Sequence, residues 1–169
     1  MRLAALSGWL ALVAGCIPMA QRMYVPAQGE VTAVLGRNCT SSYKSTLFQR
    51  DGIVLIKIAL LPRAERLAGT VQVDVLANHT VAFQDVHLRI ASPSSGSVQL
   101  ARLSGGRYTV DKPIEGFALT EFSFSSALPN APPEVSVSLP AMLIDGQSVI
   151  PEAVRFELRR QLVAEGLCQ

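Results

Sequence analysis

Short runs in which apolar and polar residues alternate recur along this chain from residue 70 onward. Between Thr70 and Leu76 three valines alternate with polar residues, and the same two-residue period returns at 135–139 and 154–159. Successive side chains of a β-strand point to opposite faces, so this period is typical of strands buried on one face. A helix would require a period of 3.6 residues. The pattern therefore predicts a chain folded mainly into sheets.

Further strands are indicated by apolar runs and by the turns between them. The run 53–61 is apolar on both alternating sets, which is typical of a strand buried on two faces. Other strands are expected at 83–90, 98–103, 107–110 and 117–126. Turn signals separate the runs at 92–97, Gly105-Gly106, 129–133 and Asp145-Gly146.

These strands predict an all-β fold, an antiparallel immunoglobulin-like β-sandwich of about seven to nine strands, with a small barrel as the alternative. We expect one domain over residues 31–169. Little helix is expected, and only 61–69 and 158–166 are candidates for short helical stretches. The single tryptophan, Trp9, lies outside this domain, so it cannot supply the buried tryptophan of immunoglobulin domains.

The first fifteen residues have the parts of a secretory signal. Arg2 supplies a positive charge, residues 3–15 are mainly apolar, and small residues precede Cys16. The apolar run is shorter than the roughly 20 residues of a membrane-spanning helix. The alternatives are ordinary cleavage without lipid and a buried helix of a cytosolic protein.

The tetrapeptide Val13-Ala14-Gly15-Cys16 resembles the lipobox of bacterial lipoproteins. The resemblance covers only this N-terminal peptide, and it implies a signal peptide over residues 1–15 and a lipidated Cys16. Ile17 stands where an aspartate is associated with inner-membrane retention, which favours the outer membrane. Residues 16–30 are then expected to be a lipidated tether that holds the domain at the periplasmic face of that membrane.

Lipidation of Cys16 would leave two of the chain's three cysteines, Cys39 and Cys168. The periplasm is oxidising, so these two can form a disulfide that joins the start of the domain to its end. A loop of that length corresponds to about 4–5 kcal/mol of stabilisation in the chain-entropy model, as an upper figure. Two unpaired thiols are the alternative.

The balance of charge argues against a nucleic-acid partner. The formal net charge of the chain is +2, and removal of Arg2 with the signal leaves +1. The basic residues are scattered, and Arg159-Arg160 is the only adjacent pair. We expect a membrane contact through Cys16 and an envelope protein or glycan as partner.

Few residues suggest catalytic chemistry. The sequence has no Gly-x-Ser-x-Gly, no phosphate-binding glycine loop and no His-Glu-x-x-His. Asp85 and His87 share one face of an expected strand, a spacing that a metal or an acid/base pair could use, and we interpret both as solvated. Asp74 and Asp85 could face each other like the carboxylates of a hydrolase if their strands are neighbours, but the sequence does not fix the distance between them. Asn38 and Asn78 begin glycosylation sequons, which matter only in a eukaryotic protein. We expect no enzyme, cofactor or metal.

Two polar segments are candidate binding loops, because adaptable turns with arginine and tyrosine are favoured at interfaces. The first segment contains Arg37, Asn38, Tyr43 and Lys44, and the second contains Arg107 and Tyr108. Plain connectors are the alternative for both. The sequence thus predicts an envelope lipoprotein that is a non-enzymatic binding or structural accessory module. A periplasmic immunity or enzyme-inhibitor lipoprotein is the first alternative, and an envelope hydrolase is the second.

Overall fold

The computed structural model describes residues 17–27, 30–35, 41–50, 52–63, 65–111, 117–128 and 131–165, which form fourteen strands and the turns between them. The first sheet has the order β1 (Ile17–Pro26), β14 (Val154–Glu165), β11 (Glu134–Ser138), β7 (His87–Ser92) and β8 (Ser97–Arg102). The second sheet has the order β10 (Phe117–Ser126), β5 (Leu67–Leu76), β4 (Val54–Pro62), β3 (Ser41–Arg50) and β2 (Glu30–Leu35). A third, smaller sheet has the order β13 (Gln147–Val149), β12 (Met142–Ile144), β6 (Thr80–Phe83) and β9 (Thr109–Asp111).

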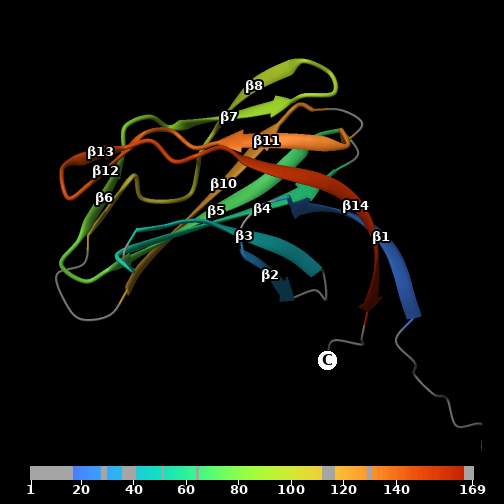
Figure 1. Ribbon diagram of the computed structural model, residues 1–169, viewed down its shortest axis with the longest axis horizontal. Helices are drawn as coiled ribbons and strands as arrows, with labels where there is room; N and C mark the ends of the chain where they lie inside the picture. Colours follow the sequence, from blue (N-terminus) through green and yellow to red (C-terminus); the bar gives the residue numbers. More distant parts are fainter. Residues whose placement is uncertain are drawn as a thin grey trace, which may run out of the picture.

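The two five-stranded sheets lie one above the other, and the third sheet lies at one end of them (Figure 1). All strand pairs are antiparallel. The apolar faces of both large sheets contribute to one buried cluster, with Leu88 and Phe156 from the first and Ile56, Val73 and Phe122 from the second. The predicted all-β, antiparallel fold is confirmed.

The two-residue period predicted for the strands agrees with the burial of their side chains. Side chains of β5 alternate between buried and half-buried along the whole strand, and its three valines have no exposed surface. Strand β10 has the bounds 117–126 that the sequence predicts. The Asp-Gly hairpin is also confirmed: Asp145 and Gly146 have φ angles of 50° and 80°, which a tight turn between β12 and β13 requires.

The prediction of one strand over 83–90 is wrong, and the strand count is higher than seven to nine. Strand β6 ends at Phe83 and β7 begins at His87, so the chain crosses here from the third sheet to the first. The Asp85 carboxylate accepts the backbone N–H of His87 at 3.0 Å. This local bond replaces a ladder bond at the crossing. Apolar and polar residues continue to alternate through the break, so the sequence pattern does not reveal it.

Neither candidate helical stretch is helical in the described residues. Residues 61–62 end β4 and 67–69 begin β5, with a turn in which the Arg63 N–H donates to the Arg66 carbonyl at 3.0 Å. Residues 158–165 continue β14, because β1 pairs with it along this length. No helix in the described residues is long and apolar enough to cross a membrane.

Most of the segment expected to be a tether is a strand of the first sheet. Strand β1 pairs with β14 over its full length, from Ile17 opposite Glu165 to Pro26 opposite Phe156. Tyr24 is buried, and its hydroxyl donates to the Pro132 carbonyl at 2.8 Å. Pairing with β1 covers what would otherwise be an open sheet edge at β14.

The buried Tyr24 makes stability sensitive to alkaline pH. Burial raises the pKa of Tyr24 to about 12, because the phenolate would lose its hydration, although nearby Arg22 opposes this shift. The unfolded chain, with a tyrosine pKa near 10, loses its proton first. Stability is therefore complete below about pH 10 and falls, by at most about 3 kcal/mol, as the pH rises to about 12.

Tyr24→Phe should remove this part of the alkaline loss. At neutral pH it should cost about 1 kcal/mol for the lost hydroxyl bond. Urea unfolding of both proteins at about pH 7 and about pH 11 measures the two effects. Equal losses of stability between these pH values would contradict the assignment.

Gly69 in β5 has no room for a side chain. A Cβ atom there would lie 2.5 Å from the Ala59 carbonyl oxygen and would overlap the Phe124 ring. Gly69→Ala should therefore lower the free energy of unfolding by about 1–3 kcal/mol, measured as a lower urea midpoint. Ser125→Ala, on the exposed face of β10, is the control and should change it by less than about 0.5 kcal/mol.

Candidate functional site

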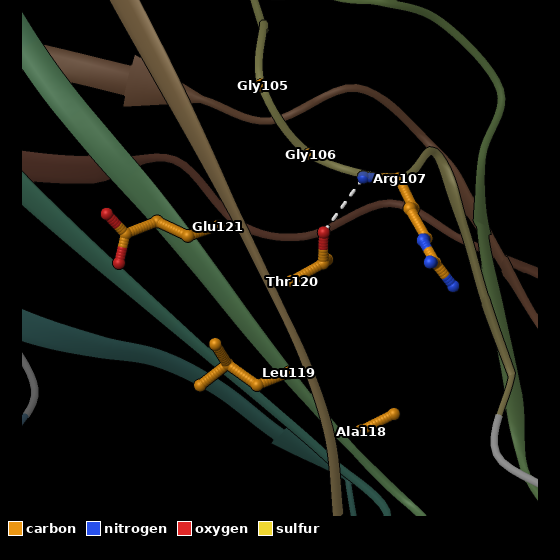
Figure 2. A pocket seen from close by; sticks show the side chains of 7 residues that line it. All are labelled: Gly105, Gly106, Arg107, Ala118, Leu119, Thr120 and Glu121. Carbon is orange, nitrogen blue, oxygen red and sulfur yellow. Dashed lines mark hydrogen bonds between the residues drawn. The ribbon is translucent and has the colours of Figure 1, made fainter.

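A shallow, open groove of about 590 Å³ lies between β10 and the turn that follows β8 (Figure 2). Strand β10 is the outermost strand of the second sheet, so the groove follows a sheet edge. Its lining residues are Gly105, Gly106, Arg107, Ala118, Leu119, Thr120 and Glu121.

Hydrogen bonds on both sides of Gly105-Gly106 hold this turn against β10. The backbone groups of Ser104 and Ser123 exchange two bonds, of 2.9 and 2.7 Å, in an isolated antiparallel bridge. The Arg107 N–H donates to the Thr120 hydroxyl at 2.9 Å, as the dashed line in Figure 2 shows. The groove therefore has two walls that are bonded to each other at each end of the glycine pair.

Both glycines are needed for this close approach. Gly105 has a φ angle of 90°, a conformation that residues with a side chain rarely adopt. A Cβ atom on Gly106 would lie 2.7 Å from the Phe122 ring. Tyr108 packs on the same ring, with 5.3 Å between the ring centroids, and its hydroxyl donates to the Leu103 carbonyl. The turn is thus packed on the core as well as hydrogen-bonded to the sheet.

The edge of β10 offers both backbone and side-chain groups. The backbone of Ser123 points to this edge, because it bonds with Ser104 there, and in a strand the backbone of Leu119 and Glu121 points the same way. The Leu119 side chain is 62% exposed, and Glu121 is exposed beside it. Figure 2 shows these two side chains on one side of β10, with Thr120 and Arg107 on the other.

Such an arrangement can bind an extended polypeptide. Apart from the bridge at Ser104, β10 pairs only with β5 in the described part of the chain. An unpaired edge accepts a further strand through its N–H and C=O groups. The apolar Leu119, the anionic Glu121 and the cationic Arg107 then supply selectivity for side chains.

The two sequence-predicted loops have different outcomes. Arg107 lines the groove, and Tyr108, the next residue, packs on the Phe122 ring. Tyr43 and Lys44 are not in a loop: they lie in β3, opposite Ala33 and Thr32 of β2. The structure therefore does not bring the two segments together as one surface in the described residues.

Arg37 and Asn38, of the first predicted loop, lie outside the residues that the structure describes, as do Cys16, Cys39 and Cys168. Lipidation of Cys16 and the disulfide between Cys39 and Cys168 stay predictions.

The acidic residues singled out in the sequence have separate partners. The Asp85 carboxylate lies 3.1 Å from His87 Nδ1, and both side chains are exposed. Hydrogen bonds from the His87 ring and backbone hold the Asp85 pKa below its usual value. Asp74 instead pairs with Lys57 at 3.3 Å. In the described ranges, no three histidine, cysteine or acidic residues gather as a metal site would require.

Sequence reasoning identified Arg107 but missed the opposite wall of the groove. One signal was present: between 119 and 126, Leu119 is an apolar residue on the face that otherwise carries Glu121 and two serines. Its meaning depended on knowing that β10 is an edge strand. Comparison with protein-family models, curated proteins and solved structures finds no match to this chain. Function is therefore inferred from the groove and the strands around it.

Thr120→Val should loosen the turn without changing the size of the side chain. It removes the acceptor of the partly buried Arg107 N–H, which should cost about 1–3 kcal/mol of stability. Amide hydrogen exchange at Arg107 should accelerate, while exchange at Ser104, on the other side of the glycines, should change less. Unchanged exchange at Arg107 would show that this bond does not hold the turn.

Proposed function

We propose that the protein is a lipid-anchored module of the bacterial cell envelope, and that its groove beside β10 binds an extended segment of another envelope protein. It acts by binding and not by catalysis. The observation that carries this proposal is an open sheet edge whose opposite wall is bonded in place at Ser104 and Arg107. A site already held in its binding shape loses little conformational entropy when the partner binds.

The groove defines the chemistry of the segment that it fits. A strand added along β10 places one of its residues opposite Glu121 and one, two positions away, opposite Leu119. Cross-strand pairs favour opposite charges and apolar contacts. The bound segment should therefore carry a basic residue two positions from an apolar one, with an acidic residue near Arg107.

The lipobox-like tetrapeptide supports the location. Cys16 directly precedes β1 in the chain, so lipid on Cys16 would hold the domain close to the membrane surface. Labelling with a radioactive fatty acid tests this anchor in wild type and Cys16→Ala. Labelled wild type and unlabelled Cys16→Ala are expected, and equal labelling of the two would overturn it.

An immunoglobulin-like sandwich, with a disulfide between Cys39 and Cys168, belongs to the same proposal. Two five-stranded antiparallel sheets that share one apolar cluster support the fold assignment. The oxidising periplasm supports the disulfide. Mass measurement after thiol alkylation, with and without prior reduction, reports whether these two cysteines are bonded.

A photo-cross-linking residue in place of Leu119 should form an adduct with the partner in intact cells. The matched control carries the same residue in place of Ile150, which is 79% exposed but does not line the groove. Only the first position should yield a defined adduct. Adducts of equal yield at both positions would contradict a specific groove.

Charge reversal tests the selectivity of the groove. Glu121→Lys should weaken binding of the cross-linked partner at least about 10-fold, because it replaces an attractive cross-strand pair by a repulsive one. Purified partner and variant, measured by calorimetry, give the affinity. Glu152→Lys, at an exposed position outside the groove, is the control and should bind as wild type does.

A further inference from the structure

The ends of β1 and β14 form a two-stranded ribbon that extends away from the sandwich (Figure 1). Strand β14 pairs with β11 only as far as Glu157, whereas it pairs with β1 up to Glu165. Beyond Glu157, in the described residues, the first sheet consists of β1 and β14 alone. Backbone pairing in this part of the first sheet is therefore limited to β1 and β14.

The residue types along the ribbon change in order. At the tip, 17–20 pair with 162–165, and Glu165 is the only charged residue in these four pairs. Gln21 opposite Gln161 follows. The next two pairs along the ribbon contain three arginines: Arg22 is opposite Arg160, and Arg159 is opposite Met23. An apolar tip is thus followed by a basic collar, which we define as Arg22, Arg159 and Arg160.

The collar is exposed and only partly neutralised within the protein. All three arginines are exposed, and Arg159 contacts Glu157 at 2.8 Å. Arg22 and Arg160 form no ion pair in the described part of the chain, and they stand directly opposite each other. Like charges at opposing positions destabilise an isolated sheet. An external anion bound to both would remove this repulsion.

We propose that the ribbon is a second membrane contact, in which the apolar tip enters the headgroup region and the collar binds anionic phospholipid headgroups. This inference rests on the proposed function, because Cys16 immediately precedes β1 and lipid on it would bring the tip to the bilayer. Apolar surface combined with basic residues is the composition that binds anionic membrane surfaces. This second contact would orient the domain. A lipid alone leaves the domain free to rotate, whereas a docked ribbon sets the direction that the groove faces.

Vesicle binding of unlipidated protein tests the ribbon separately from the anchor. The chain from residue 16 with Cys16→Ser contains every residue that the structure describes. It should sediment with vesicles of phosphatidylethanolamine and phosphatidylglycerol, but not with phosphatidylcholine vesicles. Binding should weaken as salt is raised, since exposed charges are screened.

Substitution of the collar provides the sharper measurement. Arg22→Gln with Arg160→Gln should lower partition onto anionic vesicles about 30-fold, the combined effect of two arginines near such a surface. The matched control is Arg89→Gln with Arg102→Gln, which removes two exposed arginines from β7 and β8 at the opposite side of the same sheet. The control should change partition less than about 2-fold, and both double variants should keep the urea midpoint.

Three results would overturn the inference: no binding to anionic vesicles, equal binding to phosphatidylcholine, or an equal loss in the two double variants. Each is independent of fatty-acid labelling at Cys16. A labelled Cys16 with no vesicle binding by the ribbon overturns the ribbon contact alone. Vesicle binding without labelling supports the ribbon and overturns the lipid anchor.

Discussion

Burial of one face of each large sheet against the other is the constraint on which the rest of the structure depends. Most of its strands supply apolar side chains to the shared cluster on alternate residues, and the other alternate set stays near water. The cluster includes side chains as far apart in the chain as Tyr24 and Phe156. Because this packing satisfies only one face of each sheet, it leaves the outer faces and the sheet edges available for function.

Strands β14 and β10 have different neighbours. At β14 the N-terminal strand β1 covers the edge, and the pair continues as a ribbon beyond the sandwich. At β10 the turn after β8 is hydrogen-bonded to the strand at Ser104 and again at Arg107, and a groove lies between the turn and the strand. The outer strand is thus covered by a paired strand at one edge and borders a groove at the other.

Several features were predictable because they depend on neighbouring residues alone. Strand β10, the alternation in β5 and the Asp-Gly hairpin follow from local pattern and from the φ angles that glycine and aspartate tolerate. The break at Gln84–Val86 was not predictable in this way, because the alternation continues through it. The assignment of Tyr43 and Lys44 to a loop was wrong for a related reason. Their neighbours in the sequence are polar and give no strand pattern, whereas the strand β3 is defined by its pairing with β2 and β4.

For the candidate site, the sequence by itself determined one wall of the groove. This wall is the Gly-Gly-Arg turn, whose backbone freedom and positive charge follow from its residue types. It also determined the sheet class and, through the lipobox-like tetrapeptide, the expected position at a membrane. Only the tertiary structure decided that β10 is an outer strand, that Leu119 and Glu121 are among the residues lining the groove, and that Arg22 stands opposite Arg160. Strand order and register are set by the packing of residues far apart in the chain, and alternation is the same in a central strand and in an edge strand.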